Sequence, residues 1–124
     1  MRILVVEDDY LLSTELEAGL ADAGFVVVGV ARSAAEALEL ALSERPDLIL
    51  MDIRLAGERD GVDAALDIFD RCGIRCVFAS AQADRGTRAR AEAATPLGWL
   101  AKPYSVEAAV VEIRRALARL FGDR

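Results

Sequence analysis

Carboxylates follow two apolar runs of the sequence, and their types and positions suit a shared site. Asp52 follows the run 48–51, and Glu7 and Asp8 follow the run 3–6. Runs without polar alternation are typical of central parallel strands that helices cover on both faces. The residue just past such a strand faces the crevice where open α/β sheets bind ligands. Alone, Asp52 could simply end a strand, but the second carboxylate pair favours a site.

The carboxylate cluster predicts a cation site. Two like charges about 4 Å apart repel by about 4 kcal/mol at an effective dielectric constant of about 20. Such a cluster therefore either raises a carboxylate pKa or binds a cation. Oxygen ligands without His or Cys suit Mg²⁺, which proteins usually hold through one or two carboxylates together with water and phosphate oxygens.

Two further polar side chains end apolar runs later in the chain. Ser80 follows the run 76–79, and Lys102 follows the run 99–101. An oxygen nucleophile, a metal that bridges phosphate oxygens, and hydroxyl and cationic donors are together what phosphoryl transfer requires. In this interpretation Asp52 is the nucleophile and forms an aspartyl phosphate.

The elements that must position these side chains alternate along the chain. The expected strands cover 3–6, 25–30, 48–52, 76–79 and 99–101, and the expected helices cover 10–23, 34–41, 62–69, 83–94 and 106–120. Strict alternation with short loops predicts a parallel sheet with right-handed crossovers. For five strands we expect an α/β, flavodoxin-like (βα)5 doubly wound sheet with the order 2-1-3-4-5. Strands 1 and 3 are then neighbours, and their carboxylates meet at one edge.

Several polar residues are expected to begin helices. Ser33 and Glu36 have the form of a capping box, and Ser105 suits an N-cap. Asp9 is either a neighbour of the metal ligands or the N-cap of the first helix, and we favour the cap. The expected helix 83–94 offers only alanines to the core.

Composition limits the function classes. The chain has 124 residues, of which 54% are hydrophobic, and its formal net charge is -6. We expect a single domain over 1–124 without an output domain. The negative charge argues against a nucleic-acid surface, and no run approaches the ~20 apolar residues of a membrane span. Because Glu7 interrupts the N-terminal run too soon for a signal peptide, a cytoplasmic protein is expected.

The residues that several other kinds of site require are absent from the sequence. The chain has no histidine, and its two cysteines, Cys72 and Cys76, cannot build a four-ligand zinc site. We expect both thiols to be inert. The first strand is not followed by a glycine-rich turn, which excludes a dinucleotide site. Phosphatases with an aspartate nucleophile place a second Asp two residues later, and that position is Arg54 here.

With these pieces in order, the sequence resembles the receiver domain of two-component response regulators along essentially its whole length. The resemblance rests on residues 3–9, Asp52, Asp60-Gly61, Phe78-Ala79-Ser80-Ala81 and Lys102-Pro103. It implies that Asp52 accepts a phosphoryl group from a histidine kinase or a histidine phosphotransfer protein. The Mg²⁺ ligands that it implies are Glu7, Asp8, Asp52 and the backbone carbonyl of Arg54.

The resemblance also implies how phosphorylation would be read out. Ser80 takes the position of the hydroxyl switch, and Lys102 that of the phosphate-binding lysine. Trp99 stands where the family usually has a rotating aromatic or His, so it is either a switch or a core residue. A downstream protein is expected on the face of helix 4, strand 5 and helix 5, and a weak homodimer is a further expectation. The implied protein is no enzyme beyond its own phosphorylation and dephosphorylation, and a cis bond before Pro103 fits the family.

Two readings of the whole chain stay open. The alternative to a phosphoacceptor is a docking module that keeps the receiver fold but does not respond to phosphorylation; the complete residue set speaks against it.

The departures from the family are a loop between Asp52 and Asp60 one residue longer than expected, and Ala56 where proline is common. Three arginines in the expected fourth helix are either a solvated face or a surface for an acidic partner: Arg85, Arg88 and Arg90.

Overall fold

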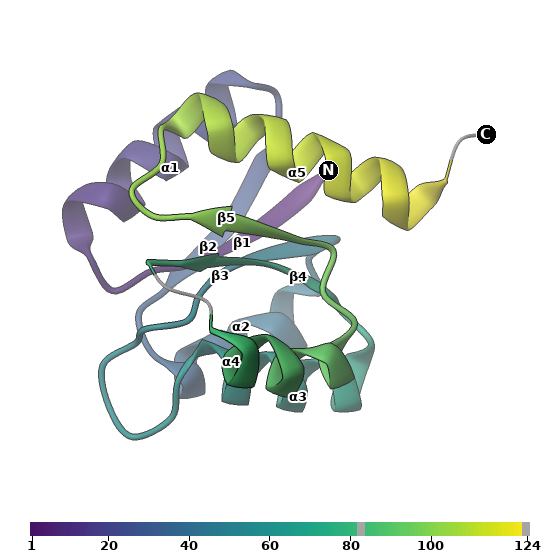
Figure 1. The fold of residues 1–124 in the computed structure, drawn as a ribbon. Coiled ribbons are helices and arrows are strands. Elements are labelled where there is room, and N and C mark those ends of the chain that lie inside the picture. Colours follow the sequence, from purple (N-terminus) through teal and green to yellow (C-terminus); the bar gives the residue numbers. More distant parts are fainter. Residues whose placement is uncertain (82–83, 123–124) are drawn as a thin grey trace.

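A parallel sheet forms the middle layer of the molecule (Figure 1). The computed structural model describes residues 1–81 and 84–122. Within these ranges the strands are β1 (Arg2–Val6), β2 (Val26–Ala31), β3 (Leu48–Asp52), β4 (Cys76–Ser80) and β5 (Gly98–Ala101). Their order is β2-β1-β3-β4-β5, and every neighbouring pair is parallel. This is the expected flavodoxin-like arrangement.

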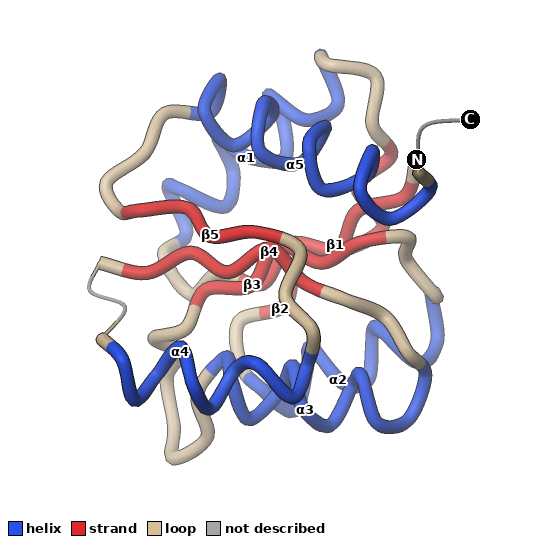
Figure 2. The backbone as a smooth tube through the Cα atoms, turned by 45° about the vertical axis from the view of Figure 1, so that its right-hand side comes forward, coloured by secondary structure: helices blue, strands red, loops and turns tan. Residues whose placement is uncertain are grey.

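Helices cover both faces of the sheet. They are α1 (Tyr10–Asp22), α2 (Ala34–Glu44), α3 (Gly61–Cys72), α4 (Arg85–Ala91) and α5 (Val106–Phe121). Figures 1 and 2 show α1 and α5 on one face, with α2, α3 and α4 on the other. Among the residues described, no helix combines the length and apolarity needed to cross a bilayer.

The apolar runs of the strands are explained by the two cores. Along β3, Leu48 and Leu50 pack into the core under α1 and α5, while Ile49 and Met51 pack into the core under α2, α3 and α4. Successive side chains of a strand point to opposite faces, so a strand between two helical layers needs apolar residues at every position. All of β3, including Asp52 at its end, is buried.

The fourth helix is shorter than expected. Asp84 caps α4 by accepting a hydrogen bond from the backbone N–H of Thr87 at 2.7 Å. A 3-10 turn (Glu92–Ala94) follows α4 and ends at Thr95, whose φ is 47°. Ala83, where the helix was expected to begin, lies outside the described residues. Among residues 84–94, which the structure describes, the buried side chains are Ala91 and Ala94, in agreement with the expectation that this segment offers only alanines to the core.

The predicted caps are confirmed, with one difference. Asp9 caps α1 and accepts from the N–H of Leu12 at 3.1 Å, and Ser105 caps α5. Ser33 caps α2 and accepts from the N–H of Glu36 at 3.2 Å. The Glu36 carboxylate, however, accepts from the N–H of Arg32 rather than that of Ser33, so the capping box is displaced by one residue.

Candidate functional site

Neighbouring strands bring the three carboxylates together. In the register of β1 and β3, Val6 pairs with Met51, so Glu7 and Asp52 leave the sheet side by side. Glu7, Asp8 and Asp52 each offer a carboxylate oxygen within 4.8 Å of the others. Glu7 is 2% exposed and Asp52 is 3% exposed, whereas Asp8 is exposed to solvent.

Lys102 reaches this cluster from the end of β5. Its Nζ atom lies 3.1 Å from Oε1 of Glu7 and 3.2 Å from Oδ2 of Asp52. The backbone N–H of Lys102 donates to the carbonyl of Ser80 at 2.9 Å, which extends the pairing of β4 and β5 to the site. The Lys102–Pro103 bond is cis, as expected.

The charges of the site are not balanced by the protein alone. Oε1 of Glu7 is buried and has no hydrogen bond to a described residue, although the Lys102 ammonium lies 3.1 Å away. Burial, and then the charge of Glu7, raise the pKa of Asp52 to about 7 against the opposing effect of Lys102. Partial burial lowers the pKa of Lys102, but its contacts with Glu7 and Asp52 outweigh this and raise it.

This donor set fits a hard cation. Three carboxylates face one ammonium, all the candidate ligands are oxygens, and one of those oxygens is buried without a hydrogen bond. Mg²⁺ prefers such oxygen ligands and keeps several waters, which the exposed side of Asp8 allows. The predicted role of the Arg54 carbonyl as a further ligand stays a prediction.

The loop after β3 folds back onto Asp52. The N–H of Arg54 donates to Oδ1 of Asp52 at 3.3 Å, and the N–H of Gly61 donates to the carbonyl of Ile53 at 2.7 Å. A Cβ atom on Gly61 would lie 2.0 Å from the backbone oxygen of Asp52. Only glycine permits this approach, which gives the Asp60-Gly61 pair a physical reason.

A cavity of about 850 Å³ opens beside Asp52. Its lining unites most of the polar residues singled out in the sequence: Asp8, Asp52, Arg54, Ser80 and Lys102. Asp84, which caps α4, and Thr87 of α4 line the same cavity, and nothing in the sequence pattern had indicated them.

Trp99 lies apart from this cavity. Its ring stacks on Phe78, with centroids 5.0 Å apart and planes at 29°, and the Arg88 guanidinium lies 4.4 Å from its centroid. Trp99 packs against the core under α2, α3 and α4 and is not among the described residues that line the cavity. Its rotation stays a prediction.

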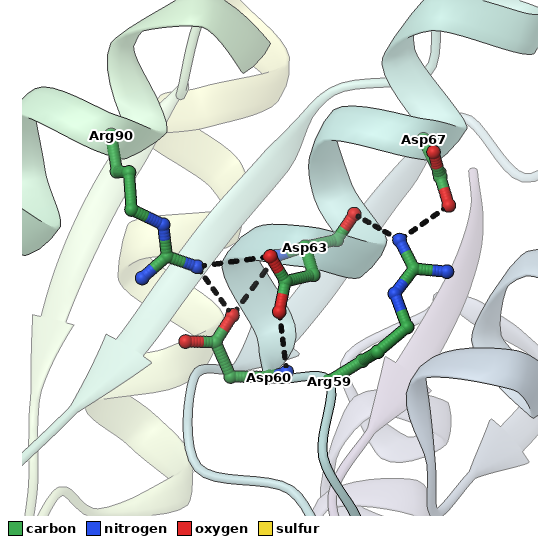
Figure 3. A network of polar contacts seen from close by, with 5 residues as sticks. All are labelled: Arg59, Asp60, Asp63, Asp67 and Arg90. Carbon is green, nitrogen blue, oxygen red and sulfur yellow. Dashed lines mark hydrogen bonds and ion pairs between the residues drawn. The ribbon is translucent and has the colours of Figure 1, made fainter.

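A polar network near the site escaped the sequence analysis (Figure 3). Asp60 caps α3 and forms a reciprocal capping box with Asp63. The signal was the spacing D-x-x-D, with Asp in place of the usual Glu. Burial would raise the pKa of Asp60, but the hydrogen bonds from Arg90 and from the backbone of Asp63 lower it.

Comparisons with known proteins agree with this geometry. The transcriptional regulatory protein PdtaR of Mycobacterium tuberculosis is 35% identical over 118 residues, which cover 95% of this chain and 57% of PdtaR. The phyllosphere-induced regulator PhyR of Methylorubrum extorquens is 36% identical over 117 residues, 94% of this chain and 43% of PhyR. The chain thus spans about half the length of these curated relatives.

A solved structure of similar sequence has the same fold as this chain. The signal receiver domain of a modulated diguanylate cyclase from Desulfovibrio desulfuricans G20 superposes with a TM-score of 0.84 at 34% identity, covering 95% of this chain and 94% of that one. The family model of the response regulator receiver domain matches residues 3–114. The chain therefore belongs to the response regulator receiver domain family of two-component signalling.

Proposed function

We propose that Asp52 accepts a phosphoryl group from a histidine kinase or a histidine phosphotransfer protein. One observation carries the proposal: the buried Asp52 carboxylate ends β3 at an open cavity, 3.2 Å from the Lys102 ammonium. A carboxylate at the floor of an open cavity can reach a donor phosphorus, and an adjacent cation favours the charge that develops there.

In the proposed transfer an ionised Asp52 oxygen forms a bond to phosphorus while the bond between phosphorus and the donor imidazole nitrogen breaks. The electron pair of that bond stays on the imidazole. The Lys102 ammonium and the Ser80 hydroxyl line the cavity and donate to phosphoryl oxygens. Mg²⁺ held by Glu7, Asp8, Asp52 and the backbone carbonyl of Arg54 would neutralise phosphoryl charge when bound.

We further propose that the protein acts as a phosphoacceptor and not as an enzyme on an external substrate. The named relatives PdtaR and PhyR are regulators. Arg54 occupies the position at which aspartate-nucleophile phosphatases place their general acid. The readout surface would be the β5 edge of the molecule, where α4 and α5 flank the sheet from opposite faces and a downstream protein could bind (Figure 1).

The test is phosphorylation by a small phosphodonor. The protein is incubated with acetyl phosphate and Mg²⁺, and its intact mass is measured. Wild type should gain one phosphoryl group, chelator should prevent the gain, and Asp52→Asn should show none. Asp47→Asn, just before β3 and at its opposite end, is the matched control and should behave as wild type. An equal gain in Asp52→Asn would contradict the proposal, and no gain in wild type would favour the docking-module alternative.

A further inference from the structure

The helix α4 has little apolar area that fixes its position. Its buried residue is Ala91, and the 3-10 turn that follows it adds Ala94. Buried area contributes roughly 25 cal/mol per Å², so two alanine methyls hold a helix far less firmly than the leucines that hold α1. Polar contacts must therefore have an unusually large share in placing α4.

Arg90 makes the ion pairs that join α4 to α3 (Figure 3). Its Nη2 atom lies 2.8 Å from Oδ1 of Asp60 and 3.2 Å from Oδ1 of Asp63. Both acceptors are already held by the backbone, because Asp60 accepts from the N–H of Asp63 at 2.9 Å and Asp63 accepts from the N–H of Asp60 at 3.0 Å. Because the backbone already fixes these two carboxylates, less side-chain entropy is lost when the half-exposed ion pairs with Arg90 form.

The same capping box is in contact with the Asp52 backbone. Asp60 precedes Gly61, whose backbone is packed against the carbonyl of Asp52 and bonded to that of Ile53. On the other side of Arg90, the N-terminal end of α4 supplies part of the cavity wall around Asp52. Arg90 thus connects the loop that packs against the Asp52 backbone with the helix that lines the cavity beside Asp52.

We infer that Arg90 is a positioning residue that latches α4 to the N-terminus of α3 and so sets one wall of the Asp52 cavity. Breaking this latch releases α4 while the rest of the fold stays intact. The inference does not depend on phosphorylation of Asp52, because it concerns contacts of the unmodified protein.

The chain supplies a matched control for the latch. Arg59 makes an ion pair of its own with Asp67 at 2.6 Å, and the Arg59 side chain is 54% exposed against 45% for Arg90. Figure 3 shows both pairs around α3. The Arg59 pair joins α3 to the loop before it and leaves α4 untouched, so Arg59→Gln removes a similar interaction without freeing α4.

Hydrogen–deuterium exchange with mass spectrometry tests the latch on the full chain. Arg90→Gln should speed exchange of the α4 amides about fivefold, which corresponds to about 1 kcal/mol of local opening, and leave α1 unchanged. Asp60→Asn should have a smaller effect in the same direction, because Asn still caps the helix but leaves Arg90 only its ion pair with Asp63. The double variant should not exceed Arg90→Gln, which already removes both ion pairs, and Arg90→Lys should restore part of the protection.

Three results would overturn the inference. The first is that Arg90→Gln changes α4 exchange no more than Arg59→Gln does. The second is that exchange rises equally in α1 and α4, which would make Arg90 a contributor to overall stability only. The third is that the effects of Arg90→Gln and Asp60→Asn add, which would mean that the two residues act independently.

Discussion

At the scale of single residues, Asp52 combines a reactive position with an unfavourable environment. It is a buried carboxylate beside a second buried carboxylate, and one lysine serves both. A buried carboxylate that is costly to ionise becomes less costly to ionise when a cation binds beside it. The strain of the unliganded site is therefore a property that ligand binding can relieve.

The pH dependence of stability should reveal this environment. Without metal, the pKa of Asp52 is about 7 in the folded protein against 3.8 for an ordinary Asp. Between these values the native state binds more protons than the unfolded state, so this group lowers stability as pH rises, by at most about 1.4 kcal/mol per pH unit. In chelator, the free energy of unfolding of Asp52→Asn should therefore increase relative to that of wild type as the pH rises from 5 to 8.

Urea denaturation at several pH values measures this difference. Comparing the two proteins at each pH cancels the titration of the shared carboxylates that lie away from Asp52. The raised pKa of Lys102 does not interfere, because its window begins above 10.5, outside this range. A stability difference between the variants that stays constant from pH 5 to pH 8 would show that Asp52 titrates normally.

At the scale of elements, the sequence predicts strands better than it predicts α4. The strand β3 is apolar at every position before Asp52, and such a run is hard to mistake once helices flank it. The residues 83–94 have high helix propensity apart from Gly86 and Thr87, but propensity does not distinguish an α-helix from a 3-10 turn. The helix changes from α to 3-10 at Glu92, and this change depends on how the backbone leads into Thr95 and β5.

Trp99 reports on whether α4 and β5 respond to the site. Its ring is in contact with Phe78 of β4 and with Arg88 of α4, so a shift of either element changes its surroundings. We expect Mg²⁺ alone to change Trp99 fluorescence little and beryllofluoride with Mg²⁺, a phosphoryl analogue, to change it substantially. Ser80→Ala should bind the analogue and lose most of that change.

Fluorine NMR provides the control for this experiment by showing that the analogue is bound. Trp99 is the only tryptophan of the chain, so the emission has a single source. If the analogue is bound and the emission stays constant, Trp99 is a core residue and any readout uses other side chains.

At the scale of the whole molecule, topology explains which parts of the site could be predicted. Glu7, Asp52 and Lys102 are far apart in sequence, but each follows a parallel strand, and parallel strands end at one edge of the sheet. The contact of Arg90 with Asp60 follows no such rule. It joins α4 to the N-cap of α3 through two side chains that are 30 residues apart in sequence and carry no periodic signal. The fold and the carboxylates were therefore predictable, whereas the latch was not.

The acidic cluster should also make the stability of the whole fold depend on Mg²⁺. The carboxylates of Glu7, Asp8 and Asp52 are held within 4.8 Å in the folded chain and separate on unfolding. A cation that binds only the native state stabilises it by RT ln(1 + [L]/Kd), about 2.7 kcal/mol at a hundredfold excess over Kd. We expect Mg²⁺ to raise the Tm of wild type well beyond NaCl at equal ionic strength, which only screens the charges.

Asp8→Asn separates repulsion from metal binding in the same melting experiment. Asp8 is exposed and forms no ion pair with a residue that the structure describes, so its removal relieves repulsion without opening a cavity. In chelator Asp8→Asn should melt above wild type, and its response to Mg²⁺ should be weaker. Asp22→Asn removes a charge of the same sign at the exposed end of α1, away from the cluster, and should keep the full Mg²⁺ response of wild type. If Asp8→Asn melts below wild type in chelator, Asp8 serves the fold as a structural residue, and the repulsion between the carboxylates is not what Mg²⁺ relieves.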